Sequence, residues 1–288
     1  MAAIDLSPRH LPCRIFHDHN IPCVVWFEDA LAYYGVPTVV FDLYILVPDA
    51  EAAAQVLVRE GWNLIPQEKG KIGNAYCRLT PPSPDSHKAQ PPTSHSRTSN
   101  LPPPPDTSPP GPTTTVLLPA ADWNFSLTGV DANNTKILGN TIFPPLAGLV
   151  DALIDSLLDC PIEQDMLRMH LGVQINYIYG RSPVLKEKAF AEQLLYEHRQ
   201  YHLDVVSGME HGTVPFILHQ RSIREALRQR THTLQECSAP NNKDLFRDRE
   251  LEAKILASMP NPFVHMEGNR KDDGWEVYDT PEENEGNF

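Results

Sequence analysis

The pattern of apolar and polar residues divides the chain into an α/β half and a helical half. Apolar runs at 23–27 and 39–47, rich in Val, Ile and aromatic residues, predict two buried strands. Residues 28–34 between them predict a short helix, with Gly35 suited to the left-handed position after its end. A strand, a short helix and a second strand therefore follow one another near the start of the chain.

Two further helices and two further strands complete the first half. Residues 11–19 and 50–60 predict helices, and Asp49 is placed to cap the second one. Residues 75–79 and 115–118 predict strands on either side of a proline-rich segment. That segment is then an insertion within one sheet and not a boundary between domains.

The second half is predicted to be helical. Apolar residues repeat at intervals of three and four over 146–158, which predicts a helix with one strongly apolar face. Residues 166–179 are apolar enough to predict a buried helix. Residues 189–206 and 223–233 predict amphipathic helices.

Two segments have compositions typical of unfolded chain. Residues 81–114 hold 12 of the 28 prolines, and the C-terminal segment is strongly acidic. The chain is therefore predicted to have five parts: the first part of an α/β core at 1–80, a Pro-rich disordered insertion at 81–114, the completion of the core at 115–143, a helical subdomain at 144–235, and a mostly disordered acidic tail at 236–288.

Charge and composition exclude some classes of partner. The 288 residues carry a formal net charge of -13. That charge argues against general nucleic-acid binding, which needs Lys and Arg, and against docking on an anionic membrane. The five cysteines contain no Cys-x-x-Cys pair and are expected to be reduced thiols. No apolar signal core or membrane-length apolar run is visible, so a cytoplasmic location is expected.

The strand pair carries residues with a recognisable spacing. Ala30 and Leu31 lie in the short helix, Gly35 begins the turn, and Asp42 lies in the second strand. This order resembles the core of the DNA polymerase-β-like nucleotidyltransferase superfamily, in a degenerate, fungal-type variant. The resemblance implies an α/β (α+β) fold with a mixed sheet, flanking helices and a following helical subdomain.

The residues that would hold metal and phosphate depart from the superfamily pattern. In that pattern two carboxylates, two positions apart on a strand, hold Mg²⁺ on one face. Here Tyr44 replaces the second acid, and Asp122 is the candidate for a third acid. Phe27 and Glu28 replace the Gly-Ser turn that approaches the triphosphate. Catalysis would rest on Asp42 and Asp122, with Mg²⁺ as the cofactor only if the protein is an active enzyme.

The resemblance also places a pocket between the strand pair and the helical half. Its expected lining is acidic and aromatic: Trp26, Glu28, Asp29, Asp42, Tyr44 and Asp122. Such a lining favours a cationic or neutral aromatic ligand over a free triphosphate.

Other polar groups offer further candidates. His198 and His202 lie four residues apart, a spacing that suits a metal ion, but a solvent-exposed helical face is the favoured interpretation. A small basic group is formed by Arg181, Lys186 and Lys188. It has the charge to bind a phosphate, but ordinary surface residues are the simpler interpretation.

Three functional hypotheses remain open. The first is a non-catalytic or repurposed nucleotidyltransferase-fold protein that binds a small molecule or a protein, because the Gly-Ser turn and the second carboxylate are lost. The second is a Mg-dependent nucleotidyltransferase acting on a small molecule or protein. The third is a protein-interaction platform that uses the Pro-rich segment and the acidic tail.

Overall fold

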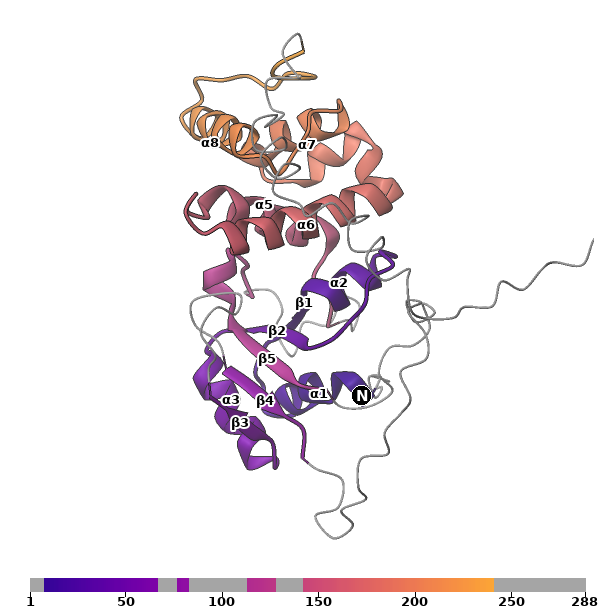
Figure 1. Cartoon of the computed structure of the whole chain (residues 1–288), viewed down its shortest axis with the longest axis vertical. Helices are drawn as coiled ribbons and strands as arrows, with labels where there is room; N and C mark the ends of the chain where they lie inside the picture. The colour runs from indigo at the N-terminus through magenta and orange to yellow at the C-terminus, as the bar shows by residue number, and fades with distance from the viewer. Residues whose placement is uncertain (1–7, 67–76, 83–112, 128–141, 241–288) are drawn as a thin grey trace, which may run out of the picture. The chain divides into compact units, whose positions relative to one another are not determined.

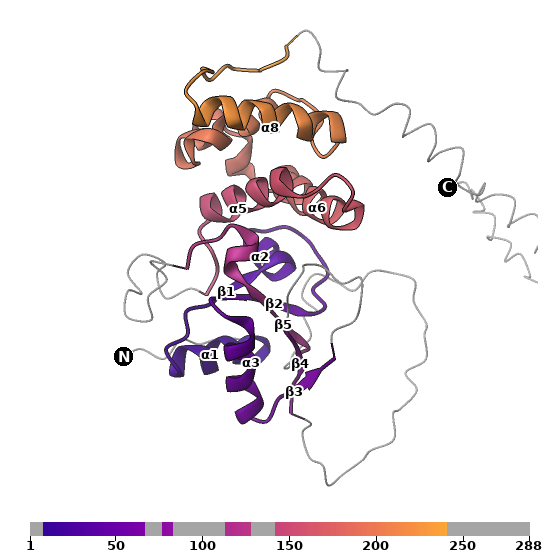
Figure 2. The same ribbon diagram turned by 90° about the vertical axis from the view of Figure 1, so that its left-hand side faces the viewer.

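The computed structural model describes residues 8–66, 77–82, 113–127 and 142–240. The chain forms two units, 1–247 and 248–288, and every described residue belongs to the first. This unit contains a mixed five-stranded sheet with helices against both faces (Figure 1, Figure 2). The expected α/β class is therefore confirmed.

The sheet has the strand order β1-β2-β5-β4-β3. Its strands are β1 (Val24–Trp26), β2 (Leu43–Val47), β3 (Asn63–Ile65), β4 (Cys77–Thr80) and β5 (Thr115–Pro119). β2 and β5 pair in parallel at the centre, whereas the other neighbouring strands are antiparallel. Because β4 and β5 are neighbours, the connection between them leaves and re-enters one sheet, as predicted.

Helices cover the sheet and form a further layer beyond it. The α-helices are α1 (Leu11–Asp18), α2 (Phe27–Tyr33), α3 (Ala50–Arg59), α5 (Leu146–Asp159), α6 (Asp165–Arg181), α7 (Arg199–Val206) and α8 (Val214–Arg228). The 3-10 helices are η1 (Pro8–His10), η2 (Ala120–Trp123), η3 (Pro183–Lys186), η4 (Lys188–Gln193) and η5 (Tyr196–His198). Among the described residues, no helix combines the length and apolarity needed to cross a membrane.

Alternate residues of the central strands face two separate cores, because strand side chains point to opposite faces in turn. Ile45 and Leu117 belong to the core shared with α1 and α3. Leu46 and Leu118 belong to the core shared with α2, α5 and α6. With both faces covered, the central strands are apolar at nearly every position, which explains why they read as continuous hydrophobic runs.

Local signals in the first half are mostly confirmed. Asp49 accepts hydrogen bonds from the backbone N–H groups of Glu51 and Ala52, so it caps α3 as predicted. Gly35 has a φ of 83°, the left-handed conformation expected after α2. The strand predicted at 39–47 is shorter, because β2 begins at Leu43 and the chain before it extends past the end of β1. The short strand β3 was not predicted.

The second half departs further from the prediction. The helix predicted at 189–206 is divided into η4, η5 and α7. α8 begins at Val214, well before the predicted 223, with Thr213 accepting a hydrogen bond from the Phe216 N–H as its cap. α6 is not fully buried: Met166 is 71% exposed and Tyr177 is 50% exposed. Part of its apolar surface therefore remains uncovered by the described residues.

The predicted acidic tail begins later than residue 236. Ser238 donates from its backbone N–H and its hydroxyl to the buried Asp204 carboxylate, at 2.7 and 2.6 Å. Gln235 is held by the Gln200 side chain, which accepts from the Gln235 N–H at 2.7 Å. The folded helical part therefore continues at least to Ser238. The disorder predicted for the Pro-rich insertion and the acidic tail lies largely outside the described residues.

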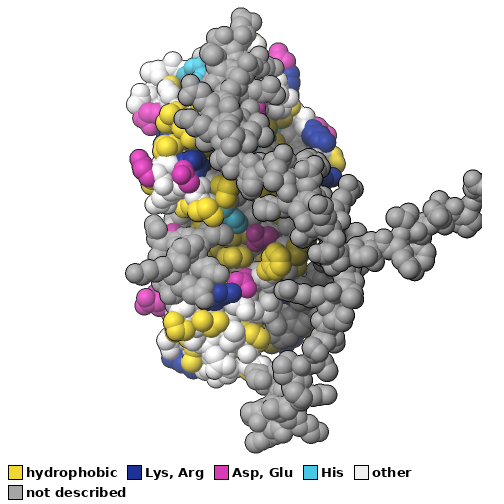
Figure 3. Space-filling view, viewed as in Figure 1, with side chains coloured by type: hydrophobic (Ala, Val, Ile, Leu, Met, Phe, Trp, Pro, Cys, Tyr) yellow, Lys and Arg dark blue, Asp and Glu magenta, His cyan; other side chains and the backbone are white. Residues whose placement is uncertain are grey.

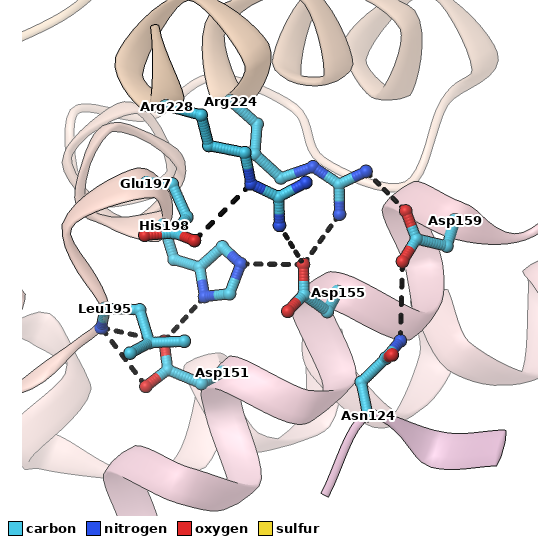
Figure 4. A network of polar contacts seen from close by, with 9 residues as sticks. All are labelled: Asn124, Asp151, Asp155, Asp159, Leu195, Glu197, His198, Arg224 and Arg228. Atoms are coloured by element: carbon cyan, nitrogen blue, oxygen red, sulfur yellow. Dashed lines mark hydrogen bonds and ion pairs between the residues drawn. The ribbon is translucent and has the colours of Figure 1, made fainter. Parts of the chain in front are cut away.

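A network of charged side chains joins α5 to η5 and α8 (Figure 4). Asp151 and Asp155 lie one turn apart on α5, and the buried His198 ring contacts both, at 2.7 and 2.9 Å. Arg224 of α8 pairs with Asp155 at 2.6 Å and also with Asp159. Burial alone would lower the pKa of His198, but the hydrogen bonds and charges of the two aspartates raise it to about 9. His198 is therefore a buried cation at neutral pH.

We expect His198→Gln to destabilise the fold in a pH-dependent way. The pKa of His198 is raised from an ordinary 6.5, so its contribution is fully present below about pH 6.5 and is lost as pH rises through 9. At pH 6 the loss of free energy of unfolding should be about 3 kcal/mol. Urea unfolding from pH 6 to pH 9.5 measures it, with His19→Gln as an exposed control. A loss that stays constant over this pH range would contradict the ionised network.

Replacing residues 83–112 by a short Gly-Ser linker should not weaken the fold. Leu79 of β4 lies opposite Thr115 of β5, so the ends of the connection are already close together. Closure entropy changes by only about 0.6 kcal/mol per doubling of loop length, and shortening lowers it. Thermal unfolding should therefore show an unchanged or slightly raised midpoint. A fall of many degrees would show that the segment contributes contacts to the fold.

Candidate functional site

The candidate site lies where β1 ends and α2 begins. Phe27 at this junction has a φ of 51°, a left-handed conformation that costs a non-glycine residue about 1–3 kcal/mol. Its buried ring meets the rings of Tyr44, Trp123 and His170 edge-on, with centroid distances of 5.3, 4.9 and 4.6 Å. The backbone therefore has a glycine-like conformation at the position where the superfamily pattern has Gly-Ser, while an aromatic ring fills the space.

Unpaired polar atoms lie beside this ring cluster. Glu28 accepts a hydrogen bond from Gln174 Nε2 at 3.1 Å through its Oε1. Glu28 Oε2, Gln174 Oε1 and His170 Nε2 are buried and have no hydrogen-bond partner among the described residues. His170 and Gln174 lie one turn apart on α6 and so face the same side, toward α2. Each such atom costs about 1–3 kcal/mol, which makes three of them together unusual.

Burial governs the protonation of this group. It raises the pKa of Glu28, although hydrogen bonds from the Glu28 backbone and from Gln174 act in the opposite direction. The charges of Asp29 and Asp42 add a smaller upward shift of the same pKa. Burial also lowers the pKa of His170 to about 4, so that ring is neutral at pH 7. No cation is therefore available at His170 to compensate Glu28, and the site offers mainly hydrogen-bond acceptors.

The neighbouring acids are already neutralised by arginines. Arg9 holds the buried Asp29 with two hydrogen bonds, from Nε at 2.7 Å and from Nη2 at 2.8 Å. Burial alone would raise the pKa of Asp29, but the hydrogen bonds and charges of Arg9 and His10 lower it. Arg78 on β4 pairs with Asp42 at 3.0 Å. Asp29 therefore stabilises the fold and does not line an open pocket, contrary to the prediction.

Asp42 and Asp122 are not brought together. β2 and β5 are parallel with Leu43 opposite Thr115, so Asp42 precedes one strand whereas Asp122 follows the other. At about 3.3 Å per residue, the five paired positions separate them by on the order of 15 Å. The residues of β5 beside Tyr44 and Asp42 carry no carboxylate. This register does not support the predicted pair of metal ligands.

Asp122 instead lines a different cavity, of about 210 Å³, at the end of β5. Its wall includes Trp123, Ser156 and Asp159. Within the described part of the chain, no group of three His, Cys, Asp or Glu side chains is placed to hold a metal ion.

The predicted lining is thus only partly assembled. Glu28 and Tyr44 are partly exposed, the Tyr44 ring contacts Phe27, and Asp42 is close enough to Glu28 to influence its pKa. Trp26 is fully buried, with its ring against Phe125 at 5.2 Å, so it belongs to the core and not to a pocket wall.

Four residues that define the site were not predicted from the sequence: Arg9, Arg78, His170 and Gln174. A signal existed for the last two, because they are polar residues four positions apart within an otherwise apolar predicted helix. The two arginines act through contacts across 20 and 36 residues of sequence, which no local pattern reveals.

The histidine pair at 198 and 202 was also interpreted wrongly. Both rings are fully buried and not on a solvent-exposed face. His198 contacts α5, whereas His202 accepts from the Tyr179 hydroxyl at 3.1 Å and donates to the Glu187 carbonyl at 3.0 Å. The two rings have different partners and do not form a metal pair.

Figure 3 shows acidic, histidine and hydrophobic side chains close together at mid-height on the face of Figure 1.

Comparisons of the chain with models of protein families, with curated proteins and with solved structures find no match. Functional inference therefore depends on the arrangement of the described residues.

Neighbouring substitutions at this site should have opposite effects on stability. Glu28→Gln removes an uncompensated buried charge and adds an N–H group near the unpaired Gln174 Oε1, so it should stabilise by about 1 kcal/mol at pH 7. Asp29→Asn breaks a buried ion pair and should destabilise by about 3–5 kcal/mol. Urea unfolding at pH 7 measures both.

The Glu28→Gln gain should disappear near pH 4, because a raised pKa means that folded Glu28 is protonated there. A destabilising Glu28→Gln at pH 7 would contradict the unpaired state of this carboxylate.

Proposed function

We propose that this protein acts by binding a small cationic ligand at the site formed by Glu28, His170 and Gln174, and not by nucleotide transfer. It is then a non-catalytic, nucleotidyltransferase-like protein of the cell interior. The observation that supports this is the set of three buried polar atoms without partners beside an aromatic cluster. A folded protein that keeps such atoms unpaired loses stability, and binding sites are a common reason.

The atoms define the chemistry of the ligand. Glu28 Oε2 and Gln174 Oε1 are both acceptors, so the ligand presents at least two N–H donors. Glu28 is ionised above its raised pKa and forms no ion pair with any residue that the structure describes, which favours a positive charge on the ligand. The Tyr44 and Phe27 rings favour a flat or aromatic body next to that charge. An aromatic amidine or amine has all three features.

The Glu28, Tyr44 and His170 side chains are each partly exposed although the unpaired atoms are covered. A ligand thus reaches those atoms after small side-chain rotations, without opening the sheet. Side-chain rotations with little movement of the backbone are common when a ligand binds at a largely preformed site.

Mg-dependent nucleotide transfer is the less supported alternative. It needs two or three carboxylates at one place to hold the metal. Here Asp42 is paired with Arg78, Asp122 lies at the other end of the parallel strands, and Phe27 fills the turn. A platform built on the Pro-rich segment and the acidic tail involves residues that lie mostly outside the described part, so no contact argues for it.

A thermal-shift titration with benzamidine and tyramine tests the proposal. Benzyl alcohol serves as the neutral analogue, and ATP is included with and without Mg²⁺. We expect the two cations to raise the unfolding midpoint by mass action, by an amount equivalent to about 2.7 kcal/mol at a hundredfold excess over Kd. Benzyl alcohol and ATP should have little effect.

Two substitutions separate the hypotheses. Glu28→Gln should abolish the shift by benzamidine, while Asp122→Asn should leave it unchanged because Asp122 lies elsewhere. An equal benzamidine shift in Glu28→Gln would contradict the proposed site. A shift by ATP with Mg²⁺ that is lost in Asp42→Asn would instead support the enzyme.

A further inference from the structure

A second cavity lies in the helical half, between α6, η3 and α7. Its volume is about 390 Å³, within the range of small-molecule sites. Tyr179, Leu185 and Val205 give it an apolar wall, and Asn176, Lys186 and His211 supply its polar groups. It shares no lining residue with the site around Glu28 or with the cavity beside Asp122.

His211 presents an unpaired ring nitrogen in this cavity. Its Nε2 is buried and has no hydrogen-bond partner among the described residues. A hydroxyl both donates and accepts, so it pairs with this nitrogen in either tautomer of the neutral ring. Burial lowers the pKa of His211, against the charge of Glu210. The ring is thus neutral at pH 7, and a ligand hydroxyl is the group that satisfies it.

The Tyr179 hydroxyl is not available to a ligand. The His202 Nε2–H donates to the Glu187 carbonyl at 3.0 Å, which leaves His202 Nδ1 as an acceptor. The Tyr179 hydroxyl donates to that nitrogen at 3.1 Å. Tyr179 therefore contributes only its ring to the cavity, as part of the apolar wall.

Lys186 supplies a positive charge at the cavity. It forms no ion pair with any residue that the structure describes, whereas Lys188, two residues later, pairs with Glu236. The basic group noted in the sequence is therefore divided: Lys186 lines the cavity, and Lys188 holds the segment near residue 236 against η4. Lys186 is exposed, and an ammonium group beside an apolar wall suits an organic anion.

We propose that this cavity binds a hydroxylated organic acid, with its anionic group at Lys186, its hydroxyl hydrogen-bonded to His211 Nε2, and its apolar body against Leu185 and Val205. The residues that would bind the anionic group, the hydroxyl and the apolar body all line one cavity. A single ligand would therefore carry all three groups. A cationic ligand is disfavoured by Lys186, and a purely apolar ligand leaves His211 unpaired.

A matched series of probes tests each feature separately. 3-Phenyllactate carries a ring, a hydroxyl and a carboxylate; 3-phenylpropionate lacks the hydroxyl; 3-phenylpropane-1,2-diol lacks the charge. Isothermal titration calorimetry should give the tightest binding for 3-phenyllactate, with Kd about tenfold weaker for each of the other two. Equal affinity across the series would overturn the proposal. The absence of binding for all three probes at a concentration of about 10 mM would overturn it as well.

Two pairs of variants assign the binding to this cavity. Lys186→Met should weaken 3-phenyllactate by about tenfold and leave the diol unchanged, whereas the matched Lys188→Met should not alter either. Gly180 lines the cavity, and a Cβ added there meets no atom within 4 Å, so the backbone tolerates a side chain at this position. Gly180→Leu should then occupy cavity space. It should abolish binding, while Gly172→Ala, elsewhere on α6, should not.

Binding that survives Gly180→Leu, or equal losses in the two lysine variants, would place the ligand elsewhere and overturn the assignment. Glu28→Gln should leave 3-phenyllactate binding unchanged, because the two sites share no residue. The failure of this proposal is thereby distinguishable from failure of the benzamidine site.

Discussion

α5 carries an apolar face toward the sheet and, toward α8, three carboxylates one turn apart. Asp151 and Asp155 are partly buried, whereas Asp159 is exposed. The two partly buried carboxylates need compensation, because a desolvated charge without a partner costs several kcal/mol. His198 and Arg224 provide it, and Asp151 also accepts from the Leu195 N–H at 3.1 Å. Leu195 is not helical, with φ -53° and ψ 142°, so its N–H is free of a helical partner and donates to Asp151. The predicted helix at 189–206 is therefore interrupted where the chain contacts the carboxylates of α5.

At Phe27, beside the sheet, an unfavourable backbone conformation is offset by favourable side-chain contacts. A strained backbone is retained, and the ring that fills the turn recovers stability through edge-on contacts with three other rings. Arg9 compensates the negative charge of Asp29, and Arg78 compensates that of Asp42. Glu28 has a hydrogen bond from Gln174 but no ion pair with a described residue, and this sets it apart from Asp29 and Asp42.

The sequence predicted the elements whose signals are local. The Asp49 cap, the Gly35 turn and the apolar repeat of α5 each depend on neighbours within a few residues, and all three are confirmed. The candidate site was predicted less well. Trp26 was assigned to a pocket wall and lies in the core, and Asp122 was assigned to a metal pair across a register that separates it from Asp42.

Those errors have one physical cause: strand register and long-range ion pairs are set by tertiary packing. A parallel β2–β5 pair and an antiparallel one contain the same apolar strings, yet they place Asp122 at opposite ends of the sheet. His170 and Gln174 were within reach of sequence reasoning, since a polar pair on an apolar helix is a local pattern. Arg9 and Arg78 were not, because their partners lie far away in sequence.

The central β2–β5 pairing also has a consequence for how the chain folds. Leu43 lies opposite Thr115, a separation of 72 residues, and β3 and β4 are synthesised in between. Pairings of such high contact order form slowly, because a large loop must close before its contacts form. During synthesis, the apolar β2 has only β1 beside it until residues 115–119 emerge from the ribosome. An open strand edge of this kind attracts other chains, so nascent β2 is the segment whose protection by a chaperone would matter most.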